Sequence, residues 1–451
     1  MKINVRKATL LVLSVALLLR MAAAVAWHQT TNEQNSYFRL GDSLSYWVLA
    51  EHIANSEPYQ YGGPDASIFR APLFPVFLAP FTQLPCSNSL QVLCARLACA
   101  AFGTLAVALL MRFASNLGGN CAAIATGAVG AVYPSAIGMS ITVLSEALFM
   151  PLMILNLLLM QKAMGAEKRG DAHGFAVASG FVAGLTILTR PSWLLFIPFA
   201  FGFMLLFGPN RNRQLTLGLV TVLAIGLTMS PWWLRNYRIT GQFVPTTLQV
   251  GLSLYDGFHQ EATGGSDTGM AFSKRLQEEQ RQADLVAASD GKQLQSTFEY
   301  RVDKRAKSQA IALATENPAR TLSLAGRKWM RTWALWPNGG DIGSPLVRIL
   351  ITFSCFSVLS FAILATFSHW QLLRRATQTN PTNSSTSLSV LAKESNPGSY
   401  LLCWLPCIYF TLLHMVFVGS IRYREPAMLI LCVLAGIALA NRAGCYAPRK
   451  N

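Results

Sequence analysis

The sequence predicts an all-α polytopic membrane protein of about ten transmembrane helices, with two large extracytoplasmic loops that carry interfacial helices. Of its 451 residues, 52% are hydrophobic and only 13% are charged, whereas a soluble globular chain carries roughly 25% charged residues. The low charge is expected of a surface embedded in lipid, where charged groups are costly. The formal net charge of +16 fits the Lys and Arg that accumulate in cytoplasmic loops.

The predicted spans follow from the length of the apolar segments, because a spanning helix needs about 20 mostly apolar residues. Two of the connections are tight hairpins, one broken near Pro134 and one broken at Arg190-Pro191. The ten expected spans are residues 8–27, 90–111, 120–139, 141–161, 173–189, 191–207, 214–233, 346–367, 399–419 and 426–441.

The first apolar segment has two interpretations. Lys2, Arg6 and Lys7 precede it and the small residues of Ala22–Ala26 end it, which is also the pattern of a cleavable signal peptide. We expect a retained membrane helix, because nine further apolar segments follow. Under either interpretation the next loop lies outside the cytoplasm.

Lys and Arg in the short connections predict the orientation. With the N-terminus in the cytoplasm, the cytoplasmic connections contain most of these residues, whereas segment 28–89 holds only Arg39 and Arg70 against five acids. We therefore expect a plasma (inner) membrane protein with both termini cytoplasmic. The expected parts are a first helix (1–27), a first extracytoplasmic loop (28–89), six helices (90–233), a large second extracytoplasmic loop (234–345), three helices (346–441) with a cytoplasmic linker (368–398), and a cytoplasmic tail (442–451).

The few ionisable residues of the spans gather toward the predicted outer face. Such residues are rare in transmembrane segments and usually functional, although a single arginine can also reach the interface by snorkelling. No acid or base lies at a predicted midplane, which weighs against a proton- or ion-coupled transporter. The outer residues are Arg20, Arg96, Glu146, Arg190 and His414 within spans, and Arg235, Arg422 and Arg424 just beyond them.

Two acids at this face have a structural as well as a functional interpretation. Asp42 precedes an amphipathic stretch, Ser43–Asn55, which is suited to lie in the membrane interface. Asp42 therefore fits the N-cap of that helix. Glu146 fits a buried, hydrogen-bonded acid. In the second loop, a charged and helix-favouring stretch from about Ser273 to Asn317 predicts soluble helices over the outer face.

Several kinds of chemistry have no motif in the chain. There is no GxxxxGK[ST], DxD, HExxH or GxSxG, and basic residues are not interleaved with aromatics as in nucleic-acid binders. The nine cysteines form no CxxC pair and lie mostly in apolar runs, which favours buried free thiols. The sequence therefore predicts no metal site.

A series of short motifs at the predicted outer face carries a family resemblance. In order, they are Gly41-Asp42-Ser43 with Tyr46 and Ala50, Tyr59, Arg70–Pro75, Leu144–Phe149, Gly184-Leu185 with Thr189–Pro191, Pro231–Tyr237 with Gly241 and Val244-Pro245, and Arg422-Tyr423-Arg424 with Pro426. In this order and spacing, which reach to about residue 430, the chain resembles the GT-C type membrane glycosyltransferases. The group in question contains the protein O-mannosyltransferases and the aminoarabinose transferases that modify lipid A.

The resemblance implies an inverting glycosyltransferase with a polyprenyl-phosphate sugar as donor, moving a hexosyl or pentosyl group to a lipid, glycan or protein acceptor. Asp42 matches the position taken as the catalytic acid/base in this family. Where relatives often carry Asp-Glu, this chain has Asp42-Ser43, so Glu146 is the candidate second carboxylate. No cofactor is implied, and a divalent metal is left open without a ligand cluster.

Arginines are the expected ligands of the donor phosphate, because the guanidinium group binds phosphate in a bidentate manner. The candidates are Arg70, Arg190, Arg235, Arg422 and Arg424. The residues expected to line the substrate are Tyr46, Tyr59, Trp233 and Tyr237.

Two other functions remain open at the level of sequence. One is a lipid or glycan transporter or flippase without transferase activity, which would need a polar pathway through the midplane. The other is an inactive scaffold that keeps the fold, against which the retention of Asp42 and the arginines argues.

Overall fold

The computed structural model describes residues 4–34, 36–39, 41–63, 66–207, 210–267, 271–337, 344–378 and 397–444. The described part is built of helices, without a strand. Eight of its helices are long and apolar enough to cross a membrane. They are α1 (Val5–Glu33), α4 (Asn88–Val132), α6 (Glu146–Gly165), α7 (Arg169–Thr189), α9 (Arg211–Thr240), α14 (Pro345–Gln378), α16 (Pro397–Val416) and α17 (Ile421–Arg442).

Helix α4 contains two antiparallel arms, residues 88–118 and 120–132, which reverse direction at Gly119. Gly119 has φ 72° and ψ −164°, a conformation that essentially requires glycine. Across the turn the arms are in contact, since a Cβ atom on Gly127 would meet the Met111 sulfur at 2.6 Å. The second arm continues through Pro134 into α5 (Pro134–Ile141). The predicted spans 90–111 and 120–139 therefore lie in separate helical segments.

A further apolar helix is shorter than the others. The 3-10 turn η1 (Pro191–Trp193) leads into α8 (Phe196–Phe207), which is an apolar helix of less than full spanning length. Together with the two arms of α4, it accounts for the ten apolar segments that the sequence predicts. The predicted all-α polytopic fold is thus confirmed.

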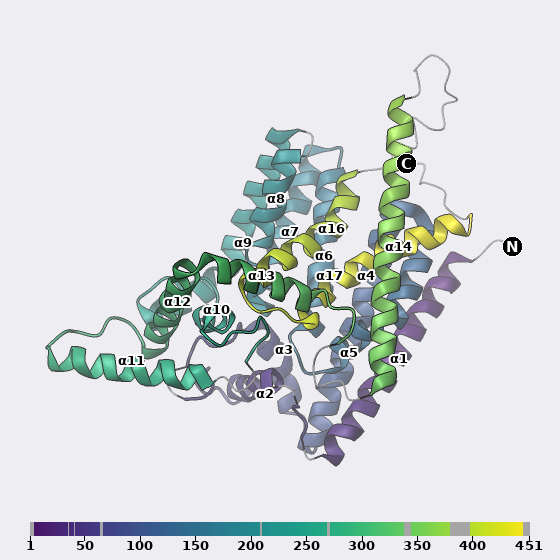
Figure 1. Cartoon of the computed structure of the whole chain (residues 1–451). Coiled ribbons are helices and arrows are strands. Elements are labelled where there is room, and N and C mark those ends of the chain that lie inside the picture. The colour runs from purple at the N-terminus through teal and green to yellow at the C-terminus, as the bar shows by residue number, and fades with distance from the viewer. Residues whose placement is uncertain are drawn as a thin grey trace.

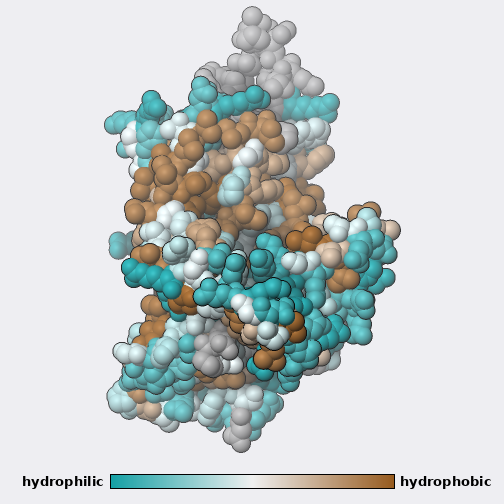
Figure 2. Space-filling model, turned by 90° about the vertical axis from the view of Figure 1, so that its left-hand side faces the viewer, coloured by the Kyte–Doolittle hydropathy of each residue, from teal (hydrophilic) through white to brown (hydrophobic). Residues whose placement is uncertain are grey.

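The long helices stand side by side in one bundle (Figure 1). Most of the shorter helices lie toward one end of it, at the lower left of the view, whereas α8 lies at the opposite end. The surface in Figure 2 has a broad hydrophobic band between hydrophilic zones, and side chains such as Leu223 and Leu227 of α9 are exposed by 72% and 78%. Because apolar groups in such a band need lipid around them, the chain is a multi-pass membrane protein. The helices at this end are α2 (Gly41–Ala54), α3 (Leu73–Thr82), α10 (Val250–Phe258), α11 (Ala271–Ser289), α12 (Phe298–Glu316) and α13 (Pro318–Thr332).

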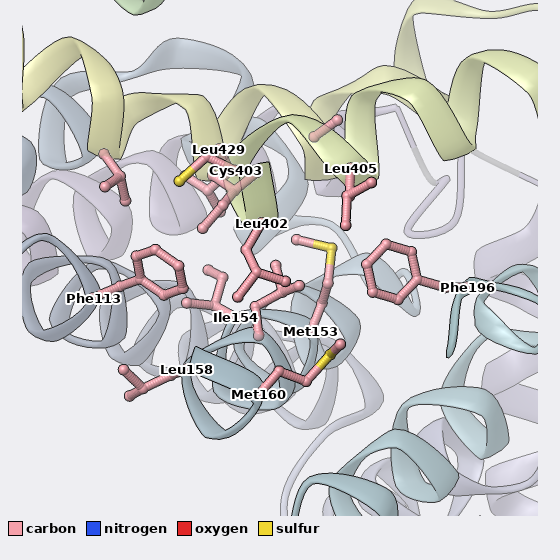
Figure 3. Close-up of a cluster of buried hydrophobic side chains, with 14 of the residues drawn as sticks. Phe113, Met153, Ile154, Leu158, Met160, Phe196, Leu402, Cys403, Leu405 and Leu429 are labelled. Carbon is pink, nitrogen blue, oxygen red and sulfur yellow. The ribbon is translucent and has the colours of Figure 1, made fainter. Parts of the chain in front are cut away.

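The core of the bundle forms around α6. Figure 3 shows Met153, Ile154 and Leu158 of α6 facing Leu402 of α16 and Leu429 of α17, all buried. Small residues bring other helices into direct contact, as where Gly436 of α17 lies against Thr126 of α4. Close approach at small residues is a main source of helix association in membranes.

Two arginines of the predicted spans are buried and join helices instead of snorkelling. Arg20 of α1 donates to the backbone oxygens of Gly130 and Ala131 at 2.9 and 3.1 Å. Arg96 of α4 donates to the Thr31 hydroxyl at 2.9 Å and to the Tyr37 carbonyl at 2.7 Å. Both side chains therefore have a structural role in this fold.

Several segment limits differ from the sequence-based expectation. Helix α14 continues to Gln378, into the expected linker 368–398, whose residues 379–396 lie outside the described part, as do residues 445–451 of the expected tail. Helix α9 runs to Thr240 and ends at Gly241, which has φ 66°. Five of the described cysteines are buried free thiols, namely Cys99, Cys355, Cys403, Cys407 and Cys432.

Candidate active site

Three helix starts meet at the end of the bundle where the short helices lie. Asp42 is in the first turn of α2, Glu146 is the first residue of α6, and Arg422 is in the first turn of α17. Acidic side chains are favoured at these positions because the first turn of a helix carries partial positive charge. Asp42 does not have the expected N-cap position, because α2 already begins at Gly41. Both of its carboxylate oxygens accept hydrogen bonds from arginines.

Arg422 lies between the two carboxylates and bonds both. Its Nη1 donates to Asp42 Oδ2 at 2.9 Å. Its Nε and Nη2 donate to Glu146 Oε1 and Oε2 at 2.5 and 3.0 Å. One guanidinium thus joins residues that the chain separates by 380 and 276 positions.

Arg190 gives Glu146 a second cation. It lies in the extended break between α7 and η1, with φ −147° and ψ 110°, because a residue before proline is disfavoured in helical conformation. From there its Nη1 reaches Glu146 Oε1 at 2.6 Å. Its guanidinium also stands 5.6 Å from the centre of the Tyr423 ring. The predicted helix break at Arg190-Pro191 therefore brings the Arg190 guanidinium to Glu146.

Arg70 gives Asp42 its second cation. Its Nη2 donates to Asp42 Oδ1 at 2.6 Å. The rest of the guanidinium is held by the Ser45 hydroxyl and the Gln249 side-chain oxygen, each at 3.0 Å, and it stands 5.1 Å from the centre of the Tyr46 ring. Each nitrogen of the Arg70 guanidinium therefore has a hydrogen-bond partner.

The two carboxylates differ in access. The Asp42 side chain is 35% exposed and the Glu146 side chain is fully buried. Burial by itself would raise the pKa of Asp42, but Arg70 and Arg422 hold that pKa well below its ordinary value. Three guanidinium groups face two carboxylates, so the cluster carries one excess positive charge. It is suited to receive an anion beside an accessible carboxylate.

The structure brings together five of the predicted catalytic and phosphate-binding residues and separates two. Arg235 lies over the rings of Trp232 and Tyr59 and donates to the Ser67 carbonyl at 3.0 Å. Arg424 is fully buried and donates to the backbone oxygens of Thr332 and Ala334. Neither arginine contacts Asp42 or Glu146.

The four aromatic residues predicted to line the substrate divide in the same way. Tyr46 is at the cluster, where its hydroxyl donates to Ser145 Oγ at 3.2 Å. Tyr59 lies next to Arg70, and its hydroxyl donates to the Arg70 carbonyl at 3.2 Å. Trp233 bonds the Pro245 carbonyl at 2.8 Å, and Tyr237 is 57% exposed; these two lie on α9, apart from the acids.

Ser45 and Gln249 contact Arg70 but were not predicted. Ser45 follows Asp42 by three residues, so a helical reading of this stretch places both on one face. Gln249 is in the second loop, and nothing in the sequence indicates its partner.

Among the described residues, no three His, Cys, Asp or Glu side chains gather as metal ligands. The two acids of the cluster do not fit such a site, because the cation of Arg422 lies between them.

Comparisons with known proteins show what the chain is similar to in sequence and in fold. Residues 69–234 match the family model described as dolichyl-phosphate-mannose-protein mannosyltransferase. The archaeal oligosaccharyltransferase AglB from Archaeoglobus fulgidus, in complex with an inhibitory peptide and a dolichol-phosphate, superposes with a TM-score of 0.55 at 14% identity, covering 98% of this chain and 52% of that one. The chain has the fold of a GT-C type membrane glycosyltransferase.

Two further structures are similar. The apo form of the Archaeoglobus fulgidus enzyme gives a TM-score of 0.54 at 14% identity, covering 96% of this chain and 50% of that one. ArnT from Cupriavidus metallidurans, bound to undecaprenyl phosphate, gives 0.43 at 16% identity, covering 96% and 78%. This chain thus spans about half the length of the oligosaccharyltransferase. A search of curated proteins gives no match.

Proposed function

We propose that the chain transfers a sugar from a polyprenyl-phosphate donor to a lipid, glycan or protein acceptor, with inversion at the anomeric carbon. The observation that carries the proposal is Arg422 placed between an accessible carboxylate, Asp42, and a buried one, Glu146. The family match over residues 69–234 supports it, because that segment supplies Arg70, Glu146 and Arg190. AglB, whose fold is similar, has been solved with a dolichol-phosphate.

In the proposed reaction, Asp42 is the general base. An acceptor hydroxyl or amine attacks the anomeric carbon and gives its proton to the Asp42 carboxylate. The bond from the anomeric carbon to the phosphate oxygen breaks, and the phosphate leaves with the electron pair. One covalent bond forms and one breaks, so no oxidant or reductant is required. A base must reach the acceptor proton, and Asp42 is the accessible acid of the pair.

The arginines stabilise the leaving phosphate, which gains negative charge as the bond breaks. Preorganised cations are most effective where water is excluded, and Arg422, Arg70 and Arg190 are all largely buried, with side chains 22%, 13% and 17% exposed. The excess positive charge of the cluster matches one added anion. Glu146 keeps Arg190 and Arg422 in position, which is its role in this proposal.

Donor binding also activates the base. With Arg70 and Arg422 bonded to it, Asp42 has a lowered pKa and is a weak base. A lipid phosphate that draws these guanidinium groups toward itself weakens their hold on Asp42, and the pKa of the carboxyl then rises toward its ordinary value. The proposed consequence is that Asp42 becomes an effective base only when donor is present.

We place this site on the extracytoplasmic side of the membrane. The short connections at the other end of the bundle carry Lys162, Lys168, Arg169, Arg211 and Arg213, and such an excess marks the cytoplasmic side. A membrane-embedded donor presents its phosphate at the headgroup level, which suits a cluster at the ends of α6 and α17.

The test is release of free polyprenyl phosphate. The purified protein in lipid vesicles is incubated with a panel of radiolabelled polyprenyl-phosphate hexoses and pentoses, with and without lipid, glycan and peptide acceptors. The proposal predicts release from one donor class, increased by the true acceptor. Absence of release from every donor, with the protein folded, contradicts it and favours transport.

A further inference from the structure

We propose that the carboxylate of Glu299, in the second loop, positions Arg70 against Asp42. The inference rests on the proposed function and adds a residue of α12 to the machinery of the first loop. Glu299 does not touch Asp42 or Arg70 itself, so its role is that of a positioning residue. The contact links residues that are 232 positions apart in the chain.

Glu299 binds the backbone of the segment that leads into Arg70. Its Oε2 accepts the Ser67 N–H at 2.9 Å and the Ile68 N–H at 3.0 Å, and its Oε1 lies 3.3 Å from the same Ile68 nitrogen. Two consecutive amides directed at one carboxylate fix the peptide plane between them. Such charge-assisted hydrogen bonds are about twice as strong as neutral ones.

The carbonyl groups of Ser67 and Ile68 also accept hydrogen bonds. The Ile68 carbonyl accepts the Leu248 N–H at 3.0 Å, and the Ser67 carbonyl accepts Arg235 Nη2 at 3.0 Å. The Ile68 side chain is fully buried. Residues 67 and 68 are thereby held on the second loop, and Arg70 follows two positions later. A change at Glu299 is therefore transmitted over a short, fixed length of backbone.

Glu299 is itself held in a rigid unit. Four residues on in α12, Asp303 accepts the Gly251 N–H of α10 at 2.6 Å, and Val302 and Ala306 are buried against Leu252 and Tyr255 of α10. Helices α10 and α12 pack against each other, as Figure 1 shows. From the same unit, Gln249 bonds Arg70 at 3.0 Å. The second loop thus holds Arg70 at two points, through its backbone by Glu299 and through its side chain by Gln249.

Because Arg70 is held at two points, the second loop has a role in orienting it. Asp42 and Arg70 both belong to the first loop, but the orientation of Arg70 is set from outside it. An acceptor that moves α12 would shift residues 67–70 and with them the pairing of Arg70 to Asp42. The Glu299 side chain is partly buried, and a polar group withdrawn from water costs free energy unless its hydrogen bonds are kept. The contact with Ser67 and Ile68 therefore contributes to holding the segment.

The test compares Glu299→Ala, Glu299→Gln and the control Glu316→Ala, which changes an exposed acid at the other end of the same helix. The first readout is hydrogen exchange of residues 66–72 in the intact protein. We expect exchange at the Ser67 and Ile68 amides to be at least tenfold faster in Glu299→Ala than in wild type or Glu316→Ala. Glu299→Gln retains an acceptor oxygen and should remain within about threefold of wild type.

The second readout is steady-state donor cleavage. We expect Glu299→Ala to lower kcat tenfold or more with KM changed less than threefold, since Arg70 acts on the leaving phosphate and on Asp42, and Glu299→Gln to recover most of kcat. Unchanged exchange in Glu299→Ala, or faster exchange with normal kcat, overturns the inference. If wild type cleaves no donor, the proposed function fails, and the exchange experiment still decides whether Glu299 holds residues 67–70.

Discussion

Arg422 and Glu146 form an ion pair with two hydrogen bonds, from Nε and from Nη2, at the meeting point of α6 and α17. The remaining nitrogen of the same guanidinium, Nη1, bonds Asp42. A planar guanidinium can bond both acids in this way, and an ammonium group cannot. The geometry therefore makes Arg422 the residue on which the arrangement of both carboxylates depends.

Replacing Arg422 by Lys should remove most activity with the positive charge kept. We expect donor cleavage to fall by about 100-fold or more, because one preorganised donor to developing charge typically contributes that much. The single ammonium nitrogen of Lys cannot reproduce the two parallel hydrogen bonds to Glu146 together with the bond to Asp42. The measurement is the initial rate of polyprenyl-phosphate release. Arg442→Lys, at the opposite end of α17, is the matched control, and equal rates for the two variants would refute the role of Arg422.

Glu146 should differ from Asp42 in its effect on stability. Glu146→Ala leaves Arg190 and Arg422 without their common partner in a buried site, and removing one member of a buried ion pair costs about 3–5 kcal/mol. Denaturant unfolding in detergent measures the loss of free energy of unfolding. The exposed Glu167, just beyond the end of α6, provides the control Glu167→Ala. A loss below about 1 kcal/mol for Glu146→Ala would mean that the pair is not needed to hold the helices.

The second loop should become less stable as the pH rises toward neutral. Burial raises the pKa of Glu299 to about 7 and that of Asp303 to about 6, although backbone N–H groups counteract this; Arg235 and Lys307 are the cations facing them. A carboxyl whose folded pKa is raised contributes stability that is complete below about pH 4 and lost as pH rises through the folded value.

The unfolding temperature of the wild type should therefore fall between about pH 4.5 and pH 7. Glu299→Gln has no proton to lose at this position and should show a smaller fall. Parallel curves for the two proteins would show that Glu299 has an ordinary pKa.

Packing at the turn before Arg422 gives a fourth prediction. A Cβ atom on Gly419 would collide with the backbone of Lys328 in α13, and Lys328 is itself buried with its Nζ donating to the Val416 carbonyl at 2.8 Å. Gly419→Ala should therefore displace the turn, lower the free energy of unfolding by about 1–3 kcal/mol and reduce donor cleavage.

The matched control for this prediction is Gly326→Ala, where a Cβ atom meets nothing within 4 Å on the same helix α13. That change should stabilise the protein by up to about 1 kcal/mol, because Ala favours helix over Gly. Loss of stability in both variants would show that the contact at Gly419 is not the cause.

Much of the fold was predictable because the bilayer restricts what a chain can do. Runs of about 20 apolar residues have few alternatives in lipid, so all ten segments appear as helices. The limits were less accurate, since α9 and α14 continue as helix past the apolar part. Length and hydropathy contain no information on where a helix ends in water.

The sequence indicated which residues to consider for the candidate site, but not which of them contact one another. The structure brings Asp42, Glu146, Arg70, Arg190 and Arg422 into one cluster. Arg424 was grouped with Arg422 because both belong to the motif Arg422-Tyr423-Arg424. On a helix, however, a spacing of two points the side chains to different faces, and Arg424 is buried. Glu299 had no sequence signal, because its partners are backbone N–H groups.

The measurement that tests the central claim most directly is donor cleavage by Asp42→Asn. The substitution keeps the size of the side chain and removes the base, and general base catalysis contributes about 10²–10⁴-fold. We predict release reduced at least 100-fold, with the free energy of unfolding within about 1 kcal/mol of wild type because the side chain is partly exposed. Release above a tenth of the wild-type rate, by a folded variant, would contradict the assignment of Asp42 as the base.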